Sequence, residues 1–432
     1  MNSIRRRLDT VLARIKAPEP IFTHLYPDAA RAAADAADAR RQAGISLGPL
    51  DGKLVTIKDL FDVAGEATTA GSTILKTKPP AKADALVVQR LRQAGAVILG
   101  KTNMTEFAFS GLGLNPHYGS PGNAIDPLRI SGGSSSGAGV SVASGLCDIA
   151  IGSDTGGSVR IPAAFNNIVG FKPTARRIPR DGVFPLSYTL DSIGPLAGSV
   201  ADCALADAVM AGEAAIVPQA ATLGGLRMGV PGERLLGGLE PAVEQAFEKA
   251  LEILTEAGVD IADHVTDDLI GDMAEVTGEV TIASAEACEI HADWLESRTA
   301  EFDPRVSSRI LLAKNFPASR YIRMLRKRNA LVTAMDERLA DIDILIAPTV
   351  AVTPPLLEPL MNDDDLYIRT NGIVLRNTTI ANTFDLTALT LPVPGTKLPV
   401  GFMLMARNGH DHRLLAIASA IESVFNSHQG TR

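Results

Sequence analysis

Aromatic residues and cysteines are scarce in this chain of 432 residues. Phe, Trp and Tyr together make up 4% of it, which leaves little material for an aromatic stacking surface. The three cysteines, Cys147, Cys203 and Cys288, lie far apart and outside any CxxC spacing. The 7 histidines are scattered, and no HExxH motif is present. We therefore expect neither a disulfide framework nor a metal site, and no cofactor.

An excess of positive charge is also missing. The formal net charge is -8, whereas binding to nucleic acid needs Lys and Arg clustered on one face. No uninterrupted apolar run approaches the ~18 residues needed to span a bilayer. Residues 1–18 have the pattern of a short amphipathic helix and lack the apolar region of a signal peptide. These features predict a cytoplasmic protein that binds neither nucleic acid directly nor a membrane.

The chain does contain a repeated pattern of an amphipathic helix, a glycine turn and a short β-branched strand. The pattern occurs at 83–100, 240–261 and 335–350. In the first of these, Asp84 is expected to cap the helix and Gly95 to end it. Helices that alternate with buried strands predict an α/β fold with a sheet between helix layers. No shift of composition separates the parts, so we expect a single domain over 1–432.

Serine and glycine dominate residues 131–158, and three interpretations of this stretch are weak. A flexible linker would not carry core-type residues such as Val140 and Ile149. A phosphate loop needs a Lys after its glycines, and the stretch contains none. Residues 133–137 match the GxSxG nucleophile elbow, but turn residues precede them and no later His stands in a recognisable context.

A fourth interpretation joins the two serine clusters of this stretch. The first cluster, at 131–136, opens a helix of small residues that can approach a sheet closely, and a strand at 147–152 leads into the loop SDTGGS. The Gly156-Gly157 pair lets backbone N–H groups converge on one point, as an oxyanion hole requires. Ser158 then stands beside that hole as a nucleophile.

A serine nucleophile needs a base, and no His is near Ser158 in the sequence. Some serine hydrolases use a neutral Lys whose pKa is lowered by burial. The SxxK spacing is absent, but Lys58 follows the β-branched run at 55–57, where a strand is expected to end. On this segment alone, an exposed Lys58 paired with Asp59 or Asp62 is the simpler interpretation.

Several motifs taken together resemble the amidase signature family of serine hydrolases. They are VTIKDL, GKTNMTEFA, ISGGSSSGAG, GSDTGGSVRIPAA, VGFKPT, TLDSIGPLAGSVAD and LPVGFMLMA. The resemblance covers residues 48–200 and about 340–420, and the combination and order of the motifs are specific. It implies a single domain with a catalytic core at 48–200 and a variable, more helical part at 211–335 that covers the core. The implied fold is a large mixed central β-sheet sandwiched between layers of α-helices.

The resemblance also implies a Ser-Ser-Lys triad that hydrolyses carboxylic acid amides. Ser158 would form the acyl-enzyme, and Lys58 would act as base through Ser134, which in this family follows a cis peptide bond. The oxyanion-hole N–H groups would come from Thr155, Gly156, Gly157 and Ser158. Ammonia or an amine would leave first, and water would then cleave the acyl-enzyme.

The neighbours of the nucleophile match the family as well. Asp154 and Arg160 are expected to form an ion pair that shapes the loop more than it takes part in catalysis. Ser153 is expected to be structural, and Ser135 and Ser136 to start a helix or to form hydrogen bonds.

The acyl group of the substrate is less well defined than the reaction. Backbone groups near Ala108 and Gly133 would bind the amide nitrogen, and Tyr188 would line an apolar pocket. The expected partner is a small-molecule amide, and a homodimer is left open. The family also contains the glutaminase component of a tRNA-dependent amidotransferase, for which this chain is short, and carbamates, ureas and anilides remain as alternative substrates. A non-catalytic binding protein is disfavoured because it need not retain the triad.

Overall fold

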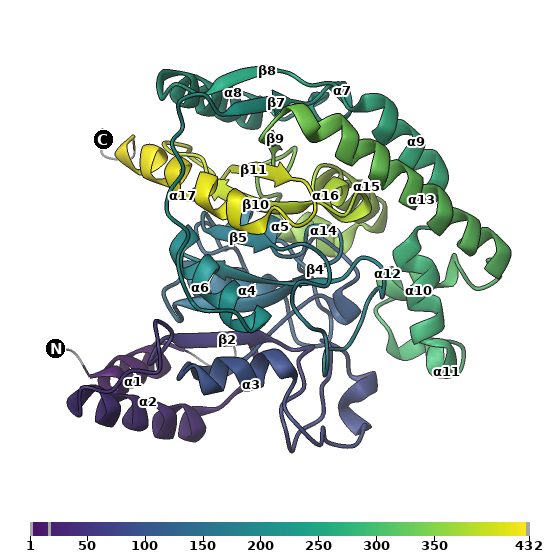
Figure 1. Ribbon diagram of the computed structural model, residues 1–432. Coiled ribbons are helices and arrows are strands. Elements are labelled where there is room, and N and C mark those ends of the chain that lie inside the picture. The colour runs from purple at the N-terminus through teal and green to yellow at the C-terminus, as the bar shows by residue number, and fades with distance from the viewer. Residues whose placement is uncertain (1–2, 16–18, 429–432) are drawn as a thin grey trace.

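The structure, a computed structural model, describes residues 3–15 and 19–428 (Figure 1). These residues form one sheet of 11 strands. The strands are β1 (Phe22–Leu25), β2 (Leu54–Lys58), β3 (Val97–Thr102), β4 (Ile149–Asp154), β5 (Val169–Lys172), β6 (Ser192–Ala197), β7 (Arg227–Val230), β8 (Asp260–Asp263), β9 (Ile344–Pro348), β10 (Thr387–Pro392) and β11 (Gly401–Ala406). They lie side by side in the order β1-β3-β2-β4-β6-β5-β10-β11-β9-β7-β8.

The sheet is mixed, as expected. β2 runs parallel to its neighbours β3 and β4, and β7 runs parallel to β8 and β9. The other neighbouring pairs are antiparallel. The predicted α/β class with a large mixed sheet is therefore confirmed.

Helices cover both faces of this sheet (Figure 1). They are α1 (Ile4–Arg14), α2 (Pro27–Gln42), α3 (Leu86–Gln93), α4 (Ser136–Ala143), α5 (Arg160–Phe165), α6 (Val200–Ala211), α7 (Glu233–Leu236), α8 (Pro241–Glu256), α9 (Asp267–Thr277), α10 (Ile282–Ile290), α11 (Ala292–Leu295), α12 (Pro304–Leu311), α13 (Ala318–Arg338), α14 (Leu357–Asn362), α15 (Asp364–Leu375), α16 (Thr379–Thr383) and α17 (Asp411–Ser427). Short 3-10 turns lie at Ile74–Thr77, Glu106–Ala108, Thr299–Glu301 and Leu339–Asp341.

Alternate residues of the central strands point to opposite faces. In β4, Ile149 and Ile151 join the core that contains α3, α6, α8 and α17, whereas Ala150 joins the core that contains α1, α2 and α4. Because both faces are covered, such a strand has a continuous apolar sequence. This explains why the buried strands could be located from short apolar runs.

The three predicted helix-turn-strand units are present. They are α3 with β3, α8 with β8, and the end of α13 with β9. The predicted cap at Asp84 is wrong. Its carboxylate instead accepts the backbone N–H of Ala64 (2.9 Å) and pairs with Arg92 (3.1 Å), so it is not available to the helix start. The expected N-terminal helix is α1, while residues 1–2 and 16–18 of that prediction lie outside the described part.

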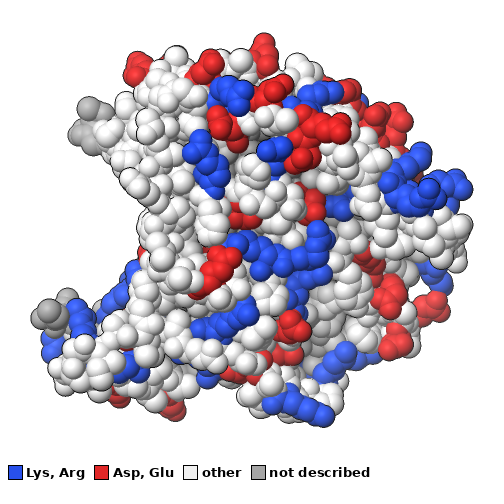
Figure 2. Space-filling model, viewed as in Figure 1, with Lys and Arg blue, Asp and Glu red and all other residues white. Residues whose placement is uncertain are grey.

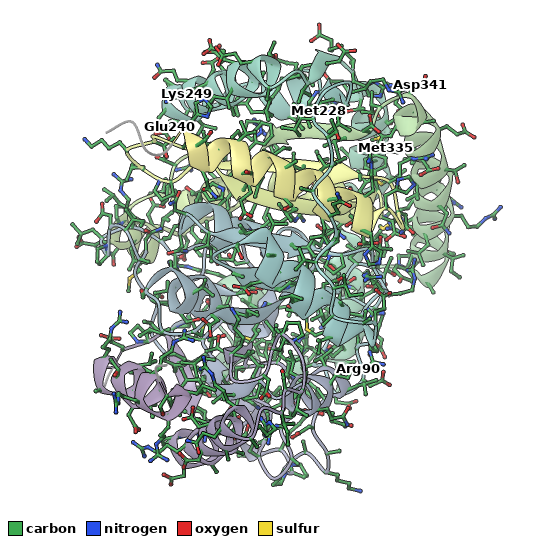
Figure 3. All side chains as sticks on the ribbon, turned by 60° about the vertical axis from the view of Figure 1, so that its left-hand side comes forward. Arg90, Met228, Glu240, Lys249, Met335 and Asp341 are labelled. Carbon is green, nitrogen blue, oxygen red and sulfur yellow. The ribbon has the colours of Figure 1, made fainter. Side chains whose placement is uncertain are left out.

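The segment 211–335 contributes helices α7 to α13 and also the edge strands β7 and β8. In Figure 3, Met228 of β7 and Met335 of α13 mark the end of the molecule that this segment builds, and Arg90 of α3 lies toward the other end. Figure 2 shows acidic and basic side chains interspersed over one face. Between residues 3 and 428, omitting 16–18, no helix is both long and apolar enough to cross a membrane.

The pairing of β2 with β4 positions the site. The two strands are parallel with Ile57 opposite Ile151, so Lys58 lies beside the last residues of β4. Helix α4 packs against the same strands, and its Gly137 has no space for a side chain because a Cβ there would meet the backbone of neighbouring segments. The small residues therefore allow the start of α4, with Ser134 before it, to lie against the strand ends.

Candidate active site

Lys58 is buried at the end of β2, and its hydrogen-bond partners are hydroxyl groups. Its Nζ donates to Oγ of Ser134 (2.7 Å) and to Oγ of Ser153 (2.9 Å). Burial lowers the pKa of Lys58 to about 7, although the carboxylates of Asp191 and Asp154 act in the opposite direction. Near pH 7 a large fraction of such a lysine is neutral, which is the form a base needs.

The simpler interpretation of Lys58, an exposed side chain paired with a neighbouring aspartate, is wrong. Asp59 pairs with Lys101 of β3 (3.8 Å) and not with Lys58. Asp62 accepts a hydrogen bond from the hydroxyl of Thr68 (2.6 Å). The lysine therefore has no ion pair with either of the carboxylates that adjoin it in the sequence.

The two serine clusters meet in front of this lysine. A cis peptide bond joins Gly133 to Ser134. The backbone N–H of Ser135 donates to the carbonyl of Ser158 (3.3 Å), which connects the segment before α4 to the loop after β4. Ser158 is 4% exposed and lines a cavity of about 230 Å³. The structure thus brings Lys58, Ser134 and the Ser158 loop to one edge of the sheet.

The loop before Ser158 has a conformation that only glycine adopts easily. Gly157 has φ +131°, and a Cβ on it would collide with the side chain of Thr378. Its N–H donates to Oδ1 of Asp154 (2.8 Å). Among the described residues, the N–H groups of Gly156 and Ser158 have no acceptor. These two donors are thus available to an oxyanion, and the contributions of Thr155 and Gly157 stay predictions.

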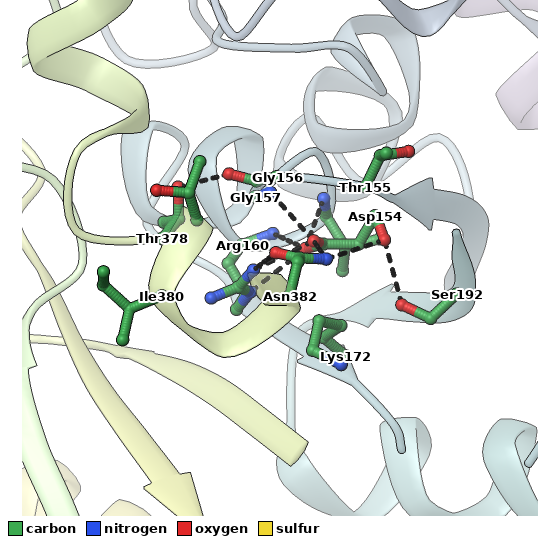
Figure 4. Close-up of polar contacts among 12 residues, drawn as sticks. Asp154, Thr155, Gly156, Gly157, Arg160, Lys172, Ser192, Thr378, Ile380 and Asn382 are labelled. Atoms are coloured by element: carbon green, nitrogen blue, oxygen red, sulfur yellow. Dashed lines mark hydrogen bonds and ion pairs between the residues drawn. The ribbon is translucent and has the colours of Figure 1, made fainter. Parts of the chain in front are cut away.

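Asp154 and Arg160 form the expected ion pair, and both are buried (Figure 4). Arg160 donates through Nη2 (2.9 Å) and Nε (3.0 Å) to the two carboxylate oxygens. Burial acts to raise the pKa of Asp154, but the guanidinium of Arg160 holds it at about 2. The resulting fixed carboxylate binds the backbone of the nucleophile loop, which supports the expected structural role.

Two residues that hold this loop were not found from the sequence. Asn382 of α16 donates to the carbonyl and to Oδ1 of Asp154 (3.0 Å each), and Thr378 donates to the carbonyl of Gly156 (2.7 Å) (Figure 4). Asn382 and Asp154 are 228 residues apart in the chain. No local motif marks such a contact, because it depends on how distant segments meet.

Asp191 connects the nucleophile loop to the neighbouring loop of the cavity. It accepts from the hydroxyl of Thr155 (2.6 Å) and from the N–H groups of Leu186 (2.9 Å) and Ser187 (3.1 Å). Burial raises the pKa of Asp191 above its usual range. Because Leu186 lines the cavity, one carboxylate positions parts of both loops.

The three predicted substrate-binding residues lie in different surroundings. Ala108 lines the cavity beside Ser158. Gly133 is buried outside the lining, and its N–H donates to the carbonyl of Gly111 (2.8 Å). Tyr188 is 55% exposed and does not belong to the lining. Binding roles for Gly133 and Tyr188 therefore stay predictions without a contact in this cavity.

The cavity combines apolar, hydroxyl and basic side chains with the backbone of the nucleophile loop. It is lined by Ala108, Phe109, Ser110, Thr155, Gly156, Ser158, Leu186, Leu190, Thr277, Thr281, Ile282, Ala283, Arg309, Leu375, Thr379 and Thr383. Within the described residues no group of three or more His, Cys, Asp or Glu is arranged to hold a metal ion. The arrangement offers a nucleophile, a base and free N–H donors.

Known proteins resemble this chain over nearly its whole length. A family model described as Amidase matches residues 6–415. The 2-amino-5-chloromuconic acid deaminase of Comamonas testosteroni is 35% identical over 91% of this chain and 86% of its own length. A component of the glutamyl-tRNA(Gln) amidotransferase of Chloroflexus aurantiacus is 36% identical over 97% and 93%. A crystal structure of an amidase matches with a TM-score of 0.87 and 32% identity, covering 98% of this chain and 96% of that one.

Proposed function

The chain belongs to the amidase family and is an amide-hydrolysing enzyme, and we propose that Lys58, Ser134 and Ser158 carry out the hydrolysis. The observation that supports this assignment most is the bond of 2.7 Å from Nζ of Lys58 to Oγ of Ser134. It lies in a buried site where the lysine has no carboxylate bonded to it. A neutral lysine can there accept the proton of a serine hydroxyl.

In the proposed acylation step, the Lys58 amine accepts the proton of the Ser134 hydroxyl while Ser134 accepts that of Ser158. The Ser158 oxygen attacks the amide carbonyl carbon, and the carbonyl oxygen becomes an oxyanion. The N–H groups of Gly156 and Ser158 stabilise this charge. The proton then returns through Ser134 to the amide nitrogen, the C–N bond breaks, and ammonia or an amine leaves.

In the second step, water attacks the ester formed on Ser158. The Ser134 hydroxyl and the Lys58 amine take up the proton of that water, as they took up the proton of the serine. The ester bond breaks, the carboxylic acid leaves, and the proton restores the Ser158 hydroxyl. No other reactant is needed, because the amide and one water supply all the atoms of the two products.

The cavity supports a small substrate. Its volume of about 230 Å³ lies below the range of roughly 300–1,000 Å³ that holds drug-sized ligands. We propose a small-molecule carboxylic acid amide, with its nitrogen near the backbone of Ala108. The residues proposed for the reaction come from a single chain, so a homodimer is not required for catalysis, and we place the enzyme in the cytoplasm.

A second candidate function uses the same residues. The matching component of the glutamyl-tRNA(Gln) amidotransferase covers 97% of this chain, so the enzyme could release ammonia from glutamine for a partner protein. Co-purification with partner proteins, together with ammonia release from glutamine and from no other amide, would favour this candidate.

The test is ammonia release from a panel of small amides, measured for the purified chain alone. The proposed function predicts turnover of at least one amide other than glutamine, and loss of that turnover in Ser158→Ala. The nucleophile-elbow alternative predicts that Ser135→Ala is the inactivating change. Turnover by folded Ser158→Ala at the rate of the unaltered enzyme would contradict the proposal.

A further inference from the structure

The cavity beside Ser158 holds one charged side chain that the proposed reaction does not use. Arg309, on α12 of the covering segment, is the single charged residue among the described residues that line it. Its guanidinium lies over the ring of Phe109, 4.3 Å from the ring centroid. Its Nη1 donates to the carbonyl of Phe109 (2.5 Å). These contacts fix the guanidinium at the cavity wall.

A second arginine on the same helix provides an internal comparison. Arg305 lies one turn before Arg309, and its Nε pairs with Asp364 (2.7 Å), while its guanidinium lies over the ring of Tyr367. Both arginines therefore contact an aromatic ring. Arg309, in contrast, has no carboxylate partner in residues 3–15 or 19–428. The charge of Arg305 is compensated by the protein, and that of Arg309 is not.

An uncompensated guanidinium in a partly closed cavity is costly unless a ligand pairs with it. Burial lowers the pKa of Arg309, yet an arginine stays charged in proteins. A guanidinium carries five N–H donors, and the bond to Phe109 uses one of them. Its planar fork suits a carboxylate, which accepts two parallel hydrogen bonds.

We propose that Arg309 binds a carboxylate of the substrate, so that the preferred substrates are small amides that also carry a carboxylate. The proposal rests on the proposed acylation of Ser158 in the same cavity. Ser158 and Arg309 both line a space of about 230 Å³, so the anion and the amide belong to one short molecule. Leu186, Leu190 and Leu375 would contact the chain between them.

The first experiment compares pairs of amides that have the same shape and differ in charge. Succinamate and succinamide form one pair, and glutaramate and glutaramide form a longer one. For at least one pair, we expect kcat/KM of the unaltered enzyme to be about 10- to 100-fold higher for the anion, the range of a hydrogen bond to a charged group. Arg309→Met should bring this ratio close to 1, and Arg309→Lys should keep part of it. Arg305→Met, which removes a cation from the same helix, should leave the ratio unchanged.

The second experiment separates this inference from the proposed function. Binding of succinate, glutarate and their diamides is measured by calorimetry with Ser158→Ala, which needs no turnover. Tighter binding of a dicarboxylate, lost when Arg309→Met is added, supports the inference even if none of these amides is hydrolysed. Equal or weaker binding of both anions overturns it, and so does a preference for anions that survives in Arg309→Met. Absence of amide turnover with every member of the wider panel would count against the proposed function alone.

Discussion

Two buried lysines lie next to each other in the sheet, and the protein surrounds them in opposite ways. Lys58 ends β2, and Lys101 lies on β3 opposite Ile57. They are 0% and 2% exposed. Lys101 forms ion pairs with Glu66 (3.0 Å) and Asp59 (3.8 Å), whereas Lys58 bonds to two serine hydroxyls. Equal burial is thus combined with different charge compensation.

This difference shows why Lys58, and not its neighbour, is suited to act as a base. A carboxylate next to an ammonium stabilises the charged form, while hydroxyl partners in a buried site give much less compensation for the cost of the charge. The charge of Lys101 contributes to the structure by compensating two carboxylates. Lys58, whose pKa burial lowers to about 7, can exchange a proton near neutral pH.

The largest expected effect is on catalysis. Lys58→Met and Ser158→Ala should each lower kcat/KM by about 10⁴-fold or more, because the loss of a nucleophile or its base removes the chemical step. The free energy of unfolding of Lys58→Met should change by only about 1 kcal/mol, since it loses hydrogen bonds to neutral groups. Amide hydrolysis and urea unfolding are the measurements. Activity of Lys58→Met within tenfold of the unaltered enzyme would remove the lysine from the mechanism.

The neighbouring lysine should give the opposite result. Lys101→Met leaves Asp59 and Glu66 without their cation, so the free energy of unfolding should fall by about 3–5 kcal/mol. The kcat of the molecules that remain folded should stay within a few-fold of the unaltered value. Urea unfolding and active-site titration check both parts. The comparison fails if Lys101→Met is as stable as Lys58→Met.

The two surroundings can also be exchanged by a single substitution. Ser153→Asp places a carboxylate next to Nζ of Lys58, which should raise its pKa by about 1–3 units. Because the base must be neutral, activity rises as pH rises through this pKa, so the rate at pH 7 should fall about 10- to 1,000-fold and recover at higher pH. The pH dependence of kcat/KM is the measurement. Ser153→Asn, which has nearly the same shape without the charge, is the control and should not show the recovery.

The smallest effect is expected from removing the Ser153 hydroxyl alone. Ser153→Ala deletes one acceptor of Nζ, so kcat should fall by about 3- to 10-fold, the equivalent of one hydrogen bond. The lost acceptor stabilises the ammonium more than the neutral amine, so the pKa of Lys58 should fall and the acid limb should move below pH 7. An acid limb that does not move would leave Ser153 with the purely structural role expected from the sequence.

Local motifs were sufficient to name Lys58, Ser134 and Ser158 as candidates, because each lies in a short segment with a recognisable pattern. Ser153 was interpreted as structural, although its hydroxyl contacts the lysine. The contact follows from the parallel pairing of β2 with β4. A continuous apolar run predicts that a strand is buried, but it does not specify which strands pair or in what register.

Residues from distant segments could not be predicted in this way. Arg309 and Asn382 reach the site on helices that come more than 100 residues after Ser158. Tyr188, expected in the pocket, is exposed because Arg180 donates to its carbonyl (2.9 Å) and Asp191 holds the adjacent N–H groups. Sequence spacing does not encode these contacts, since they depend on how the covering segment and the loops settle on the sheet.

The titration of Lys58 itself tests the central claim most directly. NMR spectra of the enzyme with isotope-labelled lysine can be followed against pH, and Lys58→Met assigns the signal of this residue. The account predicts a midpoint at about 7 for Lys58. A midpoint near about 10.4, the ordinary value for a lysine, would mean that Lys58 is charged at neutral pH and cannot be the base.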